Sequence, residues 1–122
     1  MTKSTIPEAT PTDLLSWAVG RRKRLRVRGA SMEPTLSPGD VVFVDTGAYA
    51  NSLPADGDVV VATHPNEADI EIVKRVEFTD AGGAYLKSDN LAESDAADSR
   101  RFGLVPFELI LGRVTATTNS KR

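Results

Sequence analysis

The sequence contains no cysteine and only one histidine, His64. It therefore has no disulfide framework and no thiol nucleophile, and metal sites built from several cysteines or histidines are excluded. No apolar run approaches the roughly 18 residues that a membrane-spanning helix requires. Residues 1–11 are polar and have no signal-peptide core. These absences predict a cytoplasmic protein with no cofactor, no metal and no transmembrane anchor.

The charge of the chain is nearly balanced, with a formal net charge of -2 over 122 residues. Hydrophobic residues make up 40% and charged residues 26%, which is ordinary for a single soluble domain. Such a balance gives no overall attraction to nucleic acid, which we do not expect as a partner. We expect a single domain at 12–116 between tails at 1–11 and 117–122.

Short apolar runs separated by glycine, proline and aspartate indicate strands. A helix over residues 12–19, capped by Thr12 and ended by Gly20, should precede them. Residues 88–101 are polar and should form a long loop, often a functional feature. The pattern predicts a mainly β fold, a small closed or partly open barrel or sandwich with a short N-terminal helix. The strands are expected at 41–45, 59–62, 70–78, 84–87 and 109–114.

Lys74 is the one charged residue on the apolar face of the strand expected at 70–78. Alternation places it with isoleucine, valine and phenylalanine, whereas its neighbour Arg75 points with the glutamates. Apolar burial would lower the pKa of Lys74 and favour the neutral amine, which can accept a proton. The alternative is that Lys74 reaches the rim of the sheet, or that a bulge breaks the alternation.

Ser31 lies in a glycine- and proline-containing loop, after the small residues Gly29 and Ala30. A serine hydroxyl becomes a nucleophile when a base lies beside it, and a lysine can be that base. Ser31 and Lys74 are therefore the candidate catalytic pair, and the backbone N–H of Ser31 could stabilise an oxyanion. His64, next to Pro65 and with no evident carboxylate partner, is interpreted as a surface turn residue instead of the base.

Four segments of the chain, between about residues 25 and 115, resemble the sequence blocks of the signal peptidase I family of serine peptidases. They occur in the order of that family, which makes the resemblance specific. The segments are a nucleophile box at 29–36 with Pro38-Gly39-Asp40 after it, a lysine box at 73–76, a third block at 88–90 and 98–106, and a closing strand at 110–114.

The resemblance implies a largely β fold and a Ser/Lys dyad that hydrolyses a peptide bond after small residues. Ser31 would be the nucleophile and Lys74 the general base, with Asp98 and Arg100 as a supporting ion pair. A short version of the family without a membrane anchor matures nickel-type superoxide dismutase by removing its leader. The length of the chain and its Phe102-Gly103 pair resemble that version, so the expected partner is a precursor protein, the nickel superoxide dismutase proenzyme.

The sequence departs from the family pattern at three positions. Many members have a hydroxyl residue where this chain has Gly29, and glycine where it has Ser88. Members also have a serine or threonine, which orients the lysine, where this chain has Ala96. Ser94 and Ser99 are the candidates to replace that hydroxyl.

Two alternative functions share parts of this sequence pattern. A self-cleaving SOS-type peptidase shares the Ser/Lys core, but the nearest candidate cleavage site, Val19-Gly20, lies too close to Ser31 to reach it as a free arm. A non-enzymatic β-module could bind nucleic acid or acidic lipid through residues 21–28, where six of eight side chains are basic. Alternation in that segment favours a charged edge strand. Recognition of an acidic leader is the second interpretation.

Overall fold

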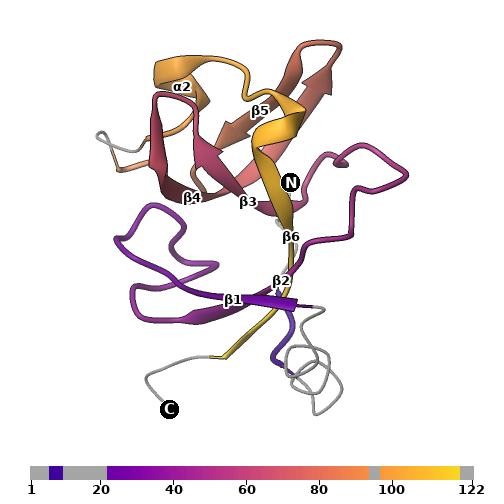
Figure 1. The fold of residues 1–122 in the computed structure, drawn as a ribbon. Helices are drawn as coiled ribbons and strands as arrows, with labels where there is room; N and C mark the ends of the chain where they lie inside the picture. Colours follow the sequence, from indigo (N-terminus) through magenta and orange to yellow (C-terminus); the bar gives the residue numbers. More distant parts are fainter. Residues whose placement is uncertain (1–5, 10–21, 94–96, 119–122) are drawn as a thin grey trace.

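Six strands form a single antiparallel sheet in the order β1-β2-β6-β3-β4-β5 (Figure 1). The computed structural model describes residues 6–9, 22–93 and 97–118, so the helix expected at 12–19 lies outside the described residues. The sheet does not close into a barrel, because β1 and β5 do not pair with each other. The mainly β fold is confirmed. The elements are β1 Arg22–Arg26, β2 Val41–Asp45, β3 Val59–His64, β4 Glu67–Asp80, β5 Gly83–Lys87, α2 Ser99–Phe102, η1 Phe107–Leu109 and β6 Ile110–Thr118.

The last strand in the sequence, β6, lies in the middle of the sheet, between β2 and β3. In Figure 1 it runs from the group formed by β3, β4, β5 and α2 to the group formed by β1 and β2. Its pairing shifts register against both neighbours, between Phe43 and Val44 and between Val61 and Ala62. Such irregularities increase the local twist of a strand. Because it pairs with both β2 and β3, β6 joins the β1–β2 pair to the sheet formed by β3, β4 and β5.

Strand β3 is buried on both of its faces, which explains its continuous apolar sequence. Val59 and Val61 pack into one core, with Met32 and Leu36 of the loop between β1 and β2. Val60 and Ala62 point the other way, into a second core with residues of β4 and β5. The loop that carries Ser31 therefore packs on one core, and Ile72 and Val76, which flank Lys74 in β4, belong to the other.

The edge strand expected from the basic segment is confirmed. β1 pairs only with β2, at one end of the sheet. Val27, just beyond it, is buried, whereas Arg24, Arg26 and Arg28 are exposed. Charged side chains on an edge strand oppose pairing with other chains.

Segments expected to be tails pair with the sheet instead. Thr117, in the segment predicted as a tail at 117–122, belongs to β6. Its N–H donates to the carbonyl of Pro7 at 2.8 Å, and its own carbonyl accepts from the N–H of Ala9 at 3.0 Å. Strand β3 pairs with β6 only as far as Arg113. The edge of β6 beyond that residue is not paired with β3, and residues 7–9 bind to it instead.

The alternation predicted for β4 is right at its centre and wrong at its ends. Ile72, Lys74 and Val76 are buried as expected, but Ile70 and Phe78 are 41% and 43% exposed. The pairing of β4 with β5 shifts register between Val76 and Phe78, which breaks the alternation. The ring of Phe78 stacks instead on Tyr85, with their centroids 5.0 Å apart.

Candidate active site

The fold brings Ser31 and Lys74 into direct contact. The Lys74 Nζ donates a hydrogen bond to the Ser31 Oγ at 2.7 Å, across 43 residues of sequence. Lys74 comes from the centre of β4 and is only 4% exposed, whereas Ser31 is partly exposed in the loop after β1. The two residues thus have the geometry of a base next to a nucleophile that solvent and ligands can reach.

The pKa of Lys74 lies below its ordinary value of 10.5, mainly because burial disfavours the ammonium. The charge of Asp98 raises it, that of Arg100 lowers it, and that of Glu93 raises it to a smaller extent. A larger fraction of Lys74 is therefore neutral near pH 7 than in a free lysine. Only the neutral amine can remove a proton from the Ser31 hydroxyl.

The loop that carries Ser31 is fixed by the backbone conformation of Gly29 and by hydrogen bonds from Asn90. Gly29 has a φ of 73°, a conformation that favours glycine, and this explains why no hydroxyl residue stands there. The backbone N–H of Asn90 donates to the carbonyl of Ser31 at 2.9 Å, and its side-chain Nδ2 donates to the carbonyl of Ala30 at 3.0 Å. Asn90 lies in the segment that resembles the third block, but no local sequence pattern indicates this role.

A buried ion pair between Arg75 and Asp89 holds the same loop to the sheet. Arg75 donates through Nε and Nη2 to the two carboxylate oxygens, both at 2.9 Å, and through Nη1 to the carbonyl of Gly57 at 2.7 Å. Thr35 adds a hydrogen bond from its Oγ1 to Asp89 at 2.6 Å. Arg75, expected on the face of the glutamates, is buried there and only 7% exposed.

Asp98 and Arg100 form the ion pair that the family resemblance implied, 3.0 Å apart. Asp98 has no exposed surface and caps α2, accepting hydrogen bonds from the backbone N–H groups of Arg100 and Ser88. Burial alone would raise the pKa of Asp98, but the hydrogen bonds from the Arg100 side chain and from Ser88 lower it below its usual value. Asp98 is therefore ionised, and its negative charge favours the ammonium of Lys74.

The serines that could replace the missing lysine-orienting hydroxyl differ in their surroundings. Ser94 and Ala96 lie outside the described residues. The Ser99 hydroxyl accepts a hydrogen bond from the backbone N–H of Leu86 at 2.8 Å, so it supports β5. Ser88 is 1% exposed, and its Oγ has no hydrogen-bond partner among the described residues.

His64 is not the surface residue that its sequence position indicated. It is 9% exposed, and its ring contacts that of Phe102 edge-on at 5.1 Å. Its Nδ1 accepts a hydrogen bond from the backbone N–H of Asn66, and its Nε2 lies 3.5 Å from a carboxylate oxygen of Glu67. The carboxylate partner of His64 is thus Glu67, which lies across the turn between β3 and β4 and has no evident signal in the sequence.

Within residues 6–9, 22–93 and 97–118, no group of three or more histidine, cysteine, aspartate or glutamate side chains is arranged to hold a metal ion. None of the helices in this part of the chain is long and apolar enough to cross a membrane.

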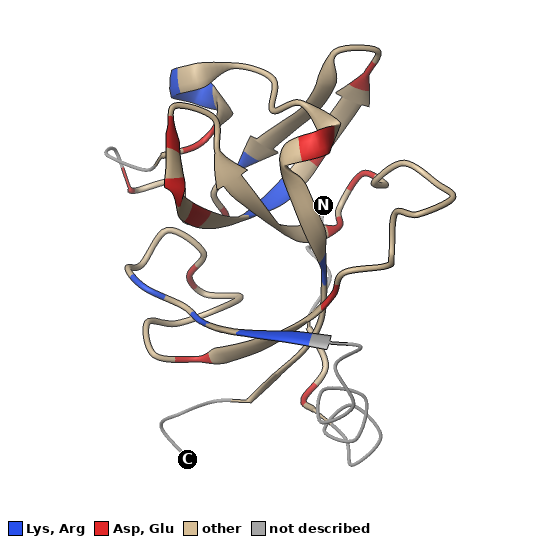
Figure 2. Cartoon of the chain, in the orientation of Figure 1, with Lys and Arg blue, Asp and Glu red and all other residues tan. Residues whose placement is uncertain are grey.

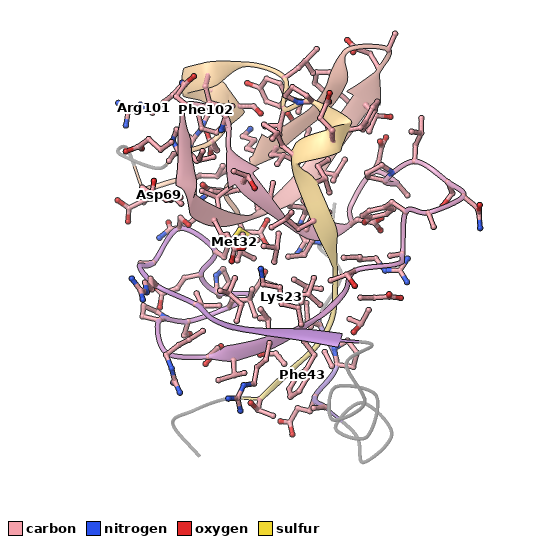
Figure 3. The ribbon with its side chains drawn as sticks, viewed as in Figure 1. Lys23, Met32, Phe43, Asp69, Arg101 and Phe102 are labelled. Atoms are coloured by element: carbon pink, nitrogen blue, oxygen red, sulfur yellow. The ribbon has the colours of Figure 1, made fainter. Side chains whose placement is uncertain are left out.

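A groove of about 690 Å³ leads to the Ser31–Lys74 pair. One side is formed by residues 25–28, at and beyond the end of β1, and the other by residues 68–74 of β4. Figure 2 shows basic residues along β1 and acidic residues at the start of β4, so the two sides carry opposite charges. Figure 3 labels two of the residues that line the groove, Met32 of the Ser31 loop and Asp69 of β4. The groove has the open, two-sided form that an extended peptide needs.

Comparison with known proteins gives a consistent picture. Residues 17–100 match the family model described as Peptidase S24-like. The chain is 31% identical over 106 residues to mitochondrial inner membrane protease subunit 1 of Mus musculus, an alignment that covers 70% of this chain and 63% of that protein. It is 42% identical over 50 residues to signal peptidase I of Aquifex aeolicus, covering 41% of this chain and 20% of that protein. The chain thus spans less than two thirds of the length of these relatives.

Proposed function

Since the chain belongs to the family of S24-like peptidases, we propose that it is a serine endopeptidase with Ser31 as the nucleophile and Lys74 as the general base. The observation that carries this proposal is the 2.7 Å hydrogen bond between the Lys74 Nζ and the Ser31 Oγ. Burial of Lys74 supports it, because a buried amine is more easily neutral and can then act as a base.

In the first half of the reaction, the neutral Lys74 amine takes the proton from the Ser31 hydroxyl as Oγ attacks the scissile carbonyl. The backbone N–H of Ser31 donates to the oxyanion that forms. The Lys74 ammonium then gives its proton to the leaving amine, and an ester joins the acyl half of the substrate to Ser31. In the second half, Lys74 takes a proton from water as it attacks the ester, and Ser31 leaves as a hydroxyl.

The substrate is an extended peptide segment in the groove between residues 25–28 and 68–74. Backbone groups at the edge of a strand can pair with such a segment whatever its side chains are. The position of the peptide along the groove therefore determines which of its peptide bonds lies next to Ser31. The names of the relatives, an inner membrane protease subunit and a signal peptidase, support removal of a leader from a precursor protein.

The finer form of the proposal names the precursor as nickel-type superoxide dismutase and the cytoplasm as the site of the reaction. Its support is the resemblance of the Phe102-Gly103 pair to the version of the family that matures this enzyme. Incubation with the purified proenzyme, followed by mass spectrometry of the new N-terminus, tests it. An uncleaved proenzyme would contradict the finer proposal alone if other peptides are cut.

We expect Ser31→Ala, Lys74→Ala and Lys74→Arg each to reduce cleavage by on the order of 10⁴-fold. Arginine fills a similar volume, but it keeps its proton at any pH at which the protein is folded, so it cannot act as the base. The assay is cleavage of a pool of short peptides that contain small residues, read by mass spectrometry.

His64→Ala is the matched control, since His64 contacts Phe102 and Glu67 and is not part of the dyad. Circular dichroism checks that every variant keeps the β fold. Cleavage by Lys74→Arg at the wild-type rate would contradict the proposed mechanism.

A further inference from the structure

We propose that the hydroxyl of Ser88 orients the amine of Lys74, as a positioning residue for the dyad; this rests on the proposed function. Ser88 occurs where the family resemblance leads one to expect glycine. Its side chain has no partner in the described part of the chain, and its place in the sheet puts it next to Lys74.

The pairing of β4 with β5 sets that place. Arg75 lies opposite Lys87 and Val76 lies opposite Leu86, so continuing the register by one residue puts Ser88 opposite Lys74. Directly opposite residues in an antiparallel pair share a face of the sheet. Ser88 therefore lies on the same face as Lys74.

Backbone hydrogen bonds indicate how close the pair is. The N–H groups of Leu86 and Ser88 both donate away from β4, to the Ser99 hydroxyl at 2.8 Å and to the Asp98 carboxylate at 2.9 Å. Ser88 and Lys74 thus face each other as a pair without backbone hydrogen bonds between them. In such pairs the Cα atoms approach to about 4.5 Å and the side chains lie nearest to each other.

The surroundings of the Ser88 hydroxyl leave it few partners. Ser88 is 1% exposed, and its Oγ makes no hydrogen bond with any described residue. Its side chain lies close enough to Asp98 to help lower the pKa of that carboxyl, although burial, which opposes this, and the hydrogen bonds from the Arg100 side chain and the Ser88 backbone N–H are larger influences. A buried hydroxyl without a partner costs free energy, and a bond to the Asp98 carboxylate together with one from the Lys74 amine would remove that cost.

This arrangement suits the chemistry of Lys74. A neutral amine has two N–H groups and one lone pair, and the lone pair must point at the Ser31 hydroxyl to accept its proton. An N–H donated to the Ser88 Oγ turns the lone pair toward Ser31, while the Ser88 O–H donates to Asp98. The same Ser88 oxygen accepts from the ammonium once it has formed, and hydrogen bonds to a charged donor are the stronger ones.

The test compares Ser88→Ala with Ser88→Thr and Ser99→Ala. We expect Ser88→Ala to lower kcat by roughly 10- to 100-fold with little change in KM, because it disturbs the base and not the groove. The pH at which Lys74 loses its proton should fall by about half a unit or more, since the ammonium loses an acceptor. Ser88→Thr, which keeps the hydroxyl, should restore both values.

Ser99→Ala is the matched control, because it also removes a buried serine hydroxyl next to α2. It should lower the temperature of unfolding without moving the titration of Lys74. A purely structural role for Ser88 would give the Ser99→Ala pattern in Ser88→Ala, and that result would overturn the inference.

A second readout needs no substrate. The Lys74 Cε signal of ¹³C-lysine-labelled protein, identified by its loss in Lys74→Arg, reports the titration of the amine directly by NMR. A lower pKa in Ser88→Ala than in wild type supports the inference, and identical titrations overturn it. Absence of peptide cleavage by the wild type would contradict the proposed function, while this titration still decides whether Ser88 bonds to Lys74.

Discussion

Lys74 and Arg75 are adjacent basic residues on β4, yet each meets a different electrostatic environment. Arg75 is neutralised by the buried carboxylate of Asp89, which accepts two of its hydrogen bonds. Lys74 donates to a neutral hydroxyl, and its charged neighbours Asp98 and Arg100 act on its pKa in opposite directions. A cation paired with a carboxylate keeps its proton, whereas a buried amine beside a hydroxyl can lose it. Arg75 is thus a structural cation, whereas the adjacent Lys74, on the other face of β4, is a candidate base.

Activity should rise with pH and level off when Lys74 is neutral. Burial, the largest influence, lowers the pKa of Lys74 below 10.5. The active form is the deprotonated one, so activity is lost as pH falls through this pKa. The kcat/KM of the wild type, measured from pH 6 to pH 10 with a peptide substrate, should therefore show a rising limb whose midpoint lies below the pKa of a free lysine.

The same profile for His64→Ala should have the same midpoint, because His64 lies outside the dyad. A wild-type rate that does not change with pH over this range would argue against Lys74 as a titrating base.

At the scale of single elements, the segment after β5 is the part of the molecule that assembles the site. Asn90 holds the backbone of the Ser31 loop, Asp89 binds Arg75 and Thr35, and Ser88 is the residue that we propose to orient Lys74. Asn90 and Asp89 therefore contact two different parts of the site. A polar run of this kind contributes to stability through buried ionic and hydrogen-bonded contacts, which are costly to break from one side only.

Asp89→Asn should lower the free energy of unfolding by roughly 3–5 kcal/mol, because it leaves the buried Arg75 guanidinium without its counter-charge. Glu77→Gln is the matched control. It removes the partner of Lys87 in a half-exposed pair at 3.6 Å, where a change within about 1 kcal/mol is expected. Urea unfolding followed by circular dichroism measures both. Equal effects of the two variants would show that the buried pair contributes no more than a surface one.

Sequence patterns identified these elements unevenly, for physical reasons. The centre of β4 could be predicted because Ile72, Lys74 and Val76 follow regular alternation. The exposure of Phe78 could not, since the bulge that causes it depends on how β5 pairs with β4. The dyad followed from local residue types, whereas the bond from Asn90 to Ala30 joins residues 60 positions apart and has no local signal.

At the scale of the whole molecule, the two cores share β3. Val60 belongs to the core beside β4 and β5, and Val61 belongs to the core beneath the Ser31 loop. Neither side chain has any exposed surface. In a sheet with one solvent-facing side, one of two consecutive residues would be exposed. Here both sides of the strand contribute to stability.

Val60→Ala and Val61→Ala should each lower the free energy of unfolding, by roughly 1–3 kcal/mol, since each leaves a cavity in a packed core. Thr46→Ala, at an exposed turn position, should change it by no more than about 0.5 kcal/mol. Urea titration of the three variants provides the measurement. If one of the two valine variants proves as stable as wild type, β3 has only a single buried face.

The central position of β6 also sets the order of events during synthesis. Residues 110–118 leave the ribosome after every other strand, yet β2 and β3 can be joined only through them. Until then, the sheet that positions the Ser31 Oγ 2.7 Å from the Lys74 Nζ is incomplete. A nascent chain therefore carries both halves of the dyad without an assembled site. Translation of the last strand completes the sheet that supports the candidate site.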